Sequence, residues 1–125
     1  MKKTPKVMVC VTRQKSCERL IKGGAALAEQ VRHSLVVVHA LSPDQNVLGD
    51  AMESEALEWL YKITAEENGE LTMLRTEDVE EALFAYATKN NVQAIVMGES
   101  PDAKDNIAAR LKARMPYVKV IVVQA

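Results

Sequence analysis

The chain contains five short runs of apolar residues that are rich in β-branched side chains. These runs are Lys6–Thr12, Leu35–His39, Leu71–Leu74, Val92–Gly98 and Tyr117–Val123. Nearly continuous apolar sequence over so short a length is typical of a strand that is covered on both faces. We therefore predict five buried strands, of which Leu71–Leu74 is the shortest and the weakest.

The segments between these runs carry apolar residues at the spacing of an amphipathic helix. The predicted buried stripes are Leu20, Gly24, Leu27, Ala28 and Val31; Met52, Ala56, Trp59, Leu60 and Ile63; Val79, Ala82, Leu83, Tyr86 and Ala87; and Ile107, Ala108, Leu111 and Met115. Residues three and four apart share one face of a helix, so each stripe predicts a helix that buries one side. We expect four helices, with Trp59 in the core.

Capping and turn residues mark the ends of the predicted helices. Ser16 is placed to cap the first helix, and Asp78 puts a carboxylate where the dipole of the third helix favours negative charge. Asn68-Gly69 predicts a left-handed stop after the second helix. The last helix, from Asp102 to Met115, ends at Pro116, which cannot continue it.

The strict alternation of strands and helices predicts an α/β fold. Parallel neighbouring strands need a crossover, and helices must cover both faces of a sheet whose strands are apolar throughout. We expect a doubly wound, right-handed, three-layer sandwich with a five-stranded parallel sheet. Residues 1–125 contain no internal repeat or linker, so they are expected to form one domain.

Composition excludes some classes of function. A formal net charge of -1 argues against nucleic acid or an anionic membrane as the main partner. The apolar run Val7–Val11 is too short for a signal peptide or a membrane span. We therefore expect a cytoplasmic protein.

The cysteines and histidines predict neither a metal site nor catalysis. Cys10 and Cys17 form no CxxC motif, and only His33 and His39 are present to join them. Cys10 is expected to be a small core residue. Cys17, in the first turn of a helix, could be a reactive thiol, although a structural role is favoured. With no base that has a partner, we expect no enzyme activity.

Two stretches resemble a known family. Residues 16–28 and the pair of segments 78–87 and 91–100 look like the universal-stress segment of KdpD-type potassium-sensing histidine kinases. Over residues 6–123 the chain resembles the universal stress protein superfamily (UspA-like). The resemblance implies a strand order of 3-2-1-4-5 and a ligand crevice between the ends of the first and fourth strands. A reversal of strand order independently favours a cleft there.

The candidate ligand-binding residues line this crevice. They are Val11, Thr12, Arg13, Lys15, Ser16, His39, Gly98, Glu99, Ser100 and Lys104. Arg13, Lys15 and Lys104, together with a helix N-terminus, form a candidate site for an anionic ligand, although ordinary solvated side chains are the favoured interpretation. Glu99 opposes an anion, and His39 could be structural rather than ligand-binding.

The sequence departs from the ATP pattern of the family. ATP-binding members carry an Asp where Thr12 stands, a second glycine where Pro101 stands, and a Gly-Ser where Leu111-Lys112 stands. Without these glycines the backbone cannot cradle phosphate closely, so ATP binding in the family manner is not expected. Only Ser100 matches the serine-rich stretch with which some relatives bind a cyclic dinucleotide. The candidate cofactors are thus an adenine nucleotide or a cyclic dinucleotide, neither of them certain.

Charge and edge composition suggest protein partners. Glu53–Glu81 holds ten acidic and two basic residues, whereas Met1–Lys22 holds seven basic and one acidic. This asymmetry could dock a partner or simply solubilise the surface. The last strand is an apolar edge in the implied order, so we expect a homodimer through Val118, Val120 and Val122 unless the last helix or the N-terminal arm covers the edge.

These observations favour a stand-alone regulatory module that binds a nucleotide-type or other anionic ligand, or a partner protein such as a signalling protein, without turnover. One alternative is a docking or dimerisation domain in stress or potassium signalling that binds no ligand. A third is a protein that binds and hydrolyses ATP.

Overall fold

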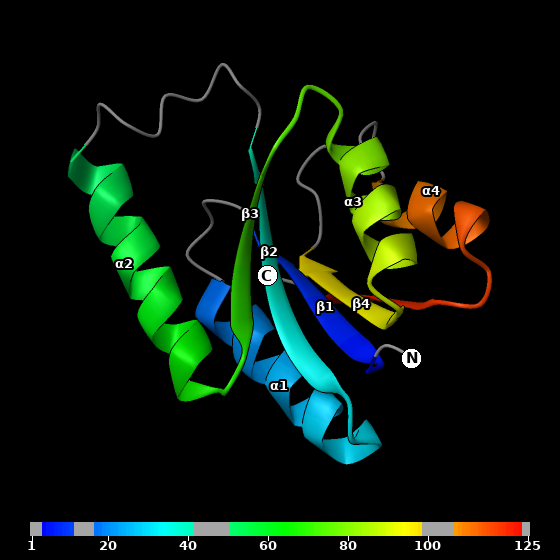
Figure 1. The fold of residues 1–125 in the computed structure, drawn as a ribbon, viewed down its shortest axis with the longest axis horizontal. Helices are drawn as coiled ribbons and strands as arrows, with labels where there is room; N and C mark the ends of the chain where they lie inside the picture. The colour runs from blue at the N-terminus through cyan, green and yellow to red at the C-terminus, as the bar shows by residue number, and fades with distance from the viewer. Residues whose placement is uncertain (1–3, 12–16, 42–50, 99–106, 124–125) are drawn as a thin grey trace.

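The computed structural model describes residues 4–11, 17–41, 51–98 and 107–123. In these ranges strands and helices alternate along the chain (Figure 1). The elements are β1 (Lys6–Val11), α1 (Cys17–Val31), β2 (Ser34–Leu41), α2 (Ala51–Glu66), β3 (Glu70–Arg75), α3 (Val79–Lys89), β4 (Val92–Gly98), α4 (Ile107–Arg114) and β5 (Lys119–Val123). The predicted succession is confirmed, and β2 and β3 are longer than the sequence suggested.

The five strands form one parallel sheet in the order β3-β2-β1-β4-β5. β1 lies at its centre, where Val7 is in register with Leu35 of β2 and with Ala94 of β4. The predicted sheet and its order are confirmed. β3 and β5 are the two outer strands, and each pairs with one neighbour among the described residues.

The helices cover both faces of the sheet, as Figure 1 shows. α1 and α2 lie over one face, and α3 and α4 lie over the other. Alternate residues of β1 enter opposite cores: Val7 and Val9 face α1, whereas Met8 and Cys10 face α3 and α4. The central strand is therefore buried on both sides, which explains its continuous apolar sequence.

Left-handed residues end three of the helices. Arg32, Asn68 and Asn91 have φ angles of 58°, 58° and 56°. At the end of α2, Asn68 takes the positive φ and the Gly69 N–H donates to the Thr64 carbonyl at 2.9 Å. The predicted stop is thus present, with asparagine rather than glycine in the left-handed conformation.

A glycine allows α1 to approach β1 closely. A Cβ on Gly24 would lie 2.2 Å from Cγ2 of Val9, whereas a Cβ on Gly23 would meet nothing within 4 Å. Gly24 therefore sets the distance between the helix and the central strand, and its neighbour does not.

Three aromatic or apolar positions differ from expectation. Trp59 is 41% exposed, so the prediction that it lies in the core is wrong. It flanks the buried stripe of Leu60 and Ile63, and α2 covers an outer part of the sheet where fewer elements surround a large side chain. Val31, at the last residue of α1, is also exposed. Tyr117 is exposed as well and precedes β5 rather than beginning it.

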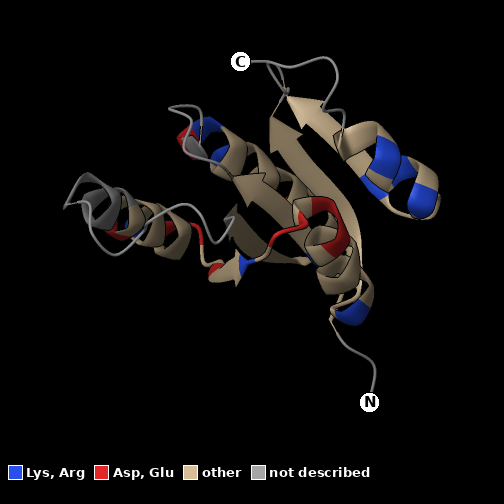
Figure 2. Ribbon diagram, turned by 90° about the horizontal axis from the view of Figure 1, so that it is seen from above, with Lys and Arg blue, Asp and Glu red and all other residues tan. Residues whose placement is uncertain are grey.

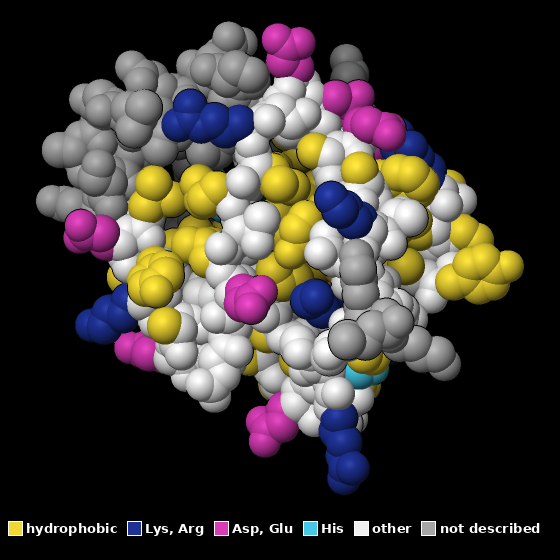
Figure 3. All heavy atoms as spheres, in the orientation of Figure 1, with side chains coloured by type: hydrophobic (Ala, Val, Ile, Leu, Met, Phe, Trp, Pro, Cys, Tyr) yellow, Lys and Arg dark blue, Asp and Glu magenta, His cyan; other side chains and the backbone are white. Residues whose placement is uncertain are grey.

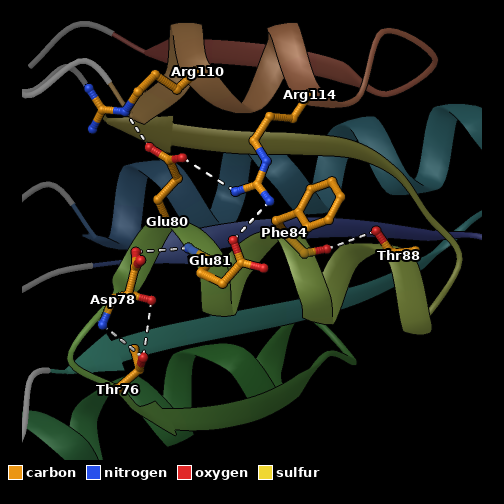
Figure 4. A network of polar contacts seen from close by, with 8 residues as sticks. All are labelled: Thr76, Asp78, Glu80, Glu81, Phe84, Thr88, Arg110 and Arg114. Atoms are coloured by element: carbon orange, nitrogen blue, oxygen red, sulfur yellow. Dashed lines mark hydrogen bonds and ion pairs between the residues drawn. The ribbon is translucent and has the colours of Figure 1, made fainter.

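Ion pairs join α3 to α4 (Figure 4). Arg114 donates from Nη1 to Glu80 at 3.3 Å and from Nη2 to Glu81 at 2.8 Å, and Arg110 also pairs with Glu80. The Arg114 guanidinium lies 3.9 Å from the centre of the Phe84 ring. At the start of α3, Asp78 accepts from the Glu81 N–H at 3.1 Å and so caps the helix, and its carboxylate lies at the helix N-terminus as predicted.

Candidate functional site

The carboxyl ends of β1, β2 and β4 meet at the reversal of strand order. β1 has β2 on one side and β4 on the other, so the chain leaves the sheet in different directions from neighbouring strands. Val11 is in register with His39, and Cys10 is in register with Met97, the residue before Gly98. Val11, His39 and Gly98, all candidate residues, therefore lie at the same end of adjacent strands.

His39 connects the ends of two of these strands. Its side chain is 8% exposed, and Nδ1 lies 3.1 Å from the carbonyl oxygen of Val11. A carbonyl only accepts, so Nδ1 is the donor in this contact. The contact supports the structural reading of His39 and fixes the orientation of its ring beside the switch point.

The remaining candidate residues lie outside the described part of the chain. These are Thr12, Arg13, Lys15, Ser16, Glu99, Ser100 and Lys104. The two segments that hold them follow β1 and β4 directly, so topology brings their starting points together. The convergence of their basic side chains stays a prediction.

Packing explains why Leu111-Lys112 stands where the family pattern has Gly-Ser. Leu111 of α4 is fully buried in the core on the α3 and α4 side, and Lys112 is exposed. A core leucine there anchors α4 to the sheet, which a glycine could not do. The residue is therefore committed to packing rather than to a phosphate cradle.

Among the described residues, Cys10 has a pKa that its surroundings shift strongly. Burial raises the pKa of the Cys10 thiol to about 12, so Cys10 stays protonated and unreactive near neutral pH. Its predicted role as a core residue is confirmed. The Cys17 side chain lies outside the described residues. In the described ranges, no group of three or more His, Cys, Asp or Glu side chains is arranged to hold a metal ion.

The helices in the described ranges include none with both the length and the apolar character needed to cross a membrane.

Sequence reasoning missed the ion pairs between α3 and α4. The pattern that could have revealed them is the pair of adjacent acids at the start of one helix and two arginines four apart on the next. Because an (i, i+4) pair shares a helix face, Arg110 and Arg114 can reach the same acidic turn. Their partners could not be assigned before the two helices were known to be neighbours.

No family model and no curated protein matches the chain. A solved structure from the universal stress protein family of Burkholderia pseudomallei matches with a TM-score of 0.71 at 22% identity, over 96% of this chain and 96% of that one. The universal stress protein from Archaeoglobus fulgidus in complex with dAMP matches with a TM-score of 0.67 at 22% identity, over 98% of each chain.

A bacterial class III photolyase from Agrobacterium tumefaciens matches with a TM-score of 0.67 at 19% identity, over 99% of this chain and 26% of the photolyase. Identities at this level establish the fold and leave the activity open. The closer resemblance to sensor kinases finds no support in these three structures. The chain has the fold of universal stress proteins, which also occurs within a photolyase.

Proposed function

We propose that this protein is a regulatory module that binds a nucleotide-type or other anionic ligand at the switch point between β1 and β4, without turnover. The observation that carries the proposal is the strand order β3-β2-β1-β4-β5, which brings the ends of β1 and β4 together. A neighbour in fold whose structure contains dAMP supports an adenine nucleotide as the ligand class.

Full ATP affinity is not part of this proposal. Pro101 and Leu111 stand where the family pattern has glycine, and the buried Leu111 side chain supports its role in packing. A site without close backbone amides holds a triphosphate weakly. A smaller nucleotide, whose recognition depends less on a phosphate cradle, suits these residues better.

The decisive experiment identifies what the purified protein carries and binds. Mass spectrometry of the denatured sample would report any nucleotide that copurifies, and calorimetry would compare AMP, cyclic AMP and ATP. We expect ATP to bind no tighter than about millimolar, equivalent to about 4 kcal/mol of binding free energy. A micromolar ATP dissociation constant would contradict the proposal, and phosphate release above the buffer background would contradict the absence of turnover.

The anionic part of the proposal has its own test. Arg13 and Lys104 flank the switch point in sequence, and charge-assisted hydrogen bonds to phosphate are strong. An Arg13→Ala, Lys104→Ala double variant is expected to bind any nucleotide found above at least about tenfold more weakly. The control is Lys62→Ala with Lys89→Ala, which removes the same charge from α2 and α3. Equal affinities of the two double variants would place the site elsewhere.

We also propose that two copies pair through β5. Val118 and Val120 contact the core on the α3 and α4 side, so those two valines already have a packing role within one copy. Val122 is 45% exposed, and among the described residues β5 pairs only with β4. The free edge therefore supports pairing with a second copy. The same edge also favours the alternative function, a dimerisation or docking domain that binds no ligand.

A further inference from the structure

β3 forms the opposite edge of the sheet. β3 pairs only with β2 among the described residues. Its sequence, Glu70–Arg75, contains neither proline nor glycine, and its two charged residues stand at its ends. The middle of β3 therefore lacks the features that normally discourage an edge strand from pairing with another chain.

Apolar side chains flank this edge. Leu71 contacts the core on the α1 and α2 side, and Leu74 contacts the core on the other side. By strand alternation Met73 shares the face of Leu71, and it is 38% exposed. On α2, Tyr61 is 66% exposed. Figure 3 looks onto this side of the molecule and shows hydrophobic side chains gathered on the surface over α2 and β3.

The charged residues that flank β3 in the sequence are mainly acidic. Between residues 66 and 78 the acidic residues are Glu66, Glu67, Glu70, Glu77 and Asp78, and the single basic residue is Arg75. Figure 2 shows acidic segments on α2, at β3 and at the start of α3. All of these acids except the half-buried Glu67 are exposed. A partner strand that docks here meets acidic residues near both ends of β3, while Figure 3 also shows Lys and Arg side chains elsewhere on this side.

We propose that the β3 edge is a docking site for an extended, lysine- or arginine-rich segment of a partner protein, which adds to the sheet as a further parallel or antiparallel strand. Main-chain hydrogen bonds to the free edge would supply affinity, and alternating apolar side chains would contact Met73 and its neighbours. The basic residues would face the acidic residues that flank β3, which disfavour acidic segments. This surface is separate from the switch point and from β5.

The probe is a synthetic peptide of alternating lysine and valine, compared with one of alternating glutamate and valine. Trp59 is the only tryptophan and lies exposed on α2, so its fluorescence reports docking on this side. We expect the basic peptide to bind at least about tenfold more tightly than the acidic one, and to weaken with added salt. Methylation of alternate backbone nitrogens in the basic peptide should remove most of its binding.

Variants locate the site. Met73→Lys places a positive charge on the β3 edge and should weaken binding of the basic peptide at least about tenfold. Val122→Lys, at a position on β5 that is 45% exposed against 38% for Met73, should leave binding unchanged. Glu70→Lys is a second test that leaves every core side chain in place. Circular dichroism confirms that each variant is folded.

Three results would overturn the proposal. Equal affinity for the acidic and basic peptides would remove the charge argument, and unchanged binding of the methylated peptide would remove the added strand. A dimer that survives Val122→Lys but dissociates in Met73→Lys would show that a second copy, rather than a basic segment, occupies this edge.

Discussion

At the scale of single residues, Gly24 determines how closely α1 approaches the sheet. Gly24→Ala would place a methyl group against the rigid side chain of Val9, and overpacking of this kind costs about 1–3 kcal/mol. Better helix propensity offsets at most about 1 kcal/mol of that cost. Urea unfolding should therefore show a less stable protein. Gly23→Ala is the matched control, since it meets no neighbour and should leave stability equal or raised.

Cys10 predicts a pH dependence of stability. Its pKa rises from an ordinary 9.0 to about 12 in the folded protein because burial disfavours the thiolate. Above pH 9 the unfolded chain loses this proton and the folded chain keeps it, so stability falls as pH rises. Between pH 9 and 12 the free energy of unfolding falls by up to about 1.4 kcal/mol per pH unit because of Cys10. Below pH 9 Cys10 causes no such loss. The free energy of unfolding, measured from pH 8 to 10.5, should fall more steeply for the wild type than for Cys10→Ala. Parallel curves for the two proteins would refute this prediction.

At the scale of elements, Arg114 joins α4 to α3 through two carboxylates and an aromatic ring. Arg114→Ala should lower the urea midpoint, and the difference from the wild type should shrink as salt screens the exposed charges. Lys112→Ala, an exposed change on the same helix, is the control. A difference that is independent of salt would assign the effect to the Phe84 contact alone.

Element types followed from the sequence because burial on two faces and burial on one face leave different patterns. β1 is apolar at every interior position since helices cover both sides, and α3 shows one stripe because it covers one. Exposure at the edges of a stripe was harder to predict. Trp59 lies one helical step from buried Leu60, and only the position of α2 over an outer part of the sheet shows how much of the indole is covered.

The candidate site was predicted less completely than the fold. Strand order placed Val11, His39 and Gly98 at one end of the sheet, as expected. The bond from His39 to the Val11 carbonyl depends on registry between β1 and β2, which no local pattern specifies. The loop candidates, from Thr12 to Ser16 and from Glu99 to Lys104, lie outside the described residues and stay predictions.

At the scale of the whole molecule, the proposed pairing of two copies through β5 is tested by mass in solution. Light scattering at tens of micromolar should report a dimer for the wild type and a monomer for Val120→Lys combined with Val122→Lys, because lysines on an edge oppose pairing. Since Val120 also contacts the core, Val122→Lys alone is a milder version that spares the fold. A wild-type monomer, or a dimer that survives both substitutions, would contradict this interface.

The Asn68-Gly69 turn after α2 also affects how readily the protein deamidates. Asn-Gly pairs lose ammonia readily when the glycine nitrogen attacks the asparagine side chain, and asparagine is among the residues that limit durability on heating. In the folded chain the Gly69 nitrogen donates to the Thr64 carbonyl at 2.9 Å, which holds it away from that reaction. Deamidation at Asn68 should therefore proceed mainly through molecules that have opened, and its slow accumulation in a stored sample would record how often the fold comes apart.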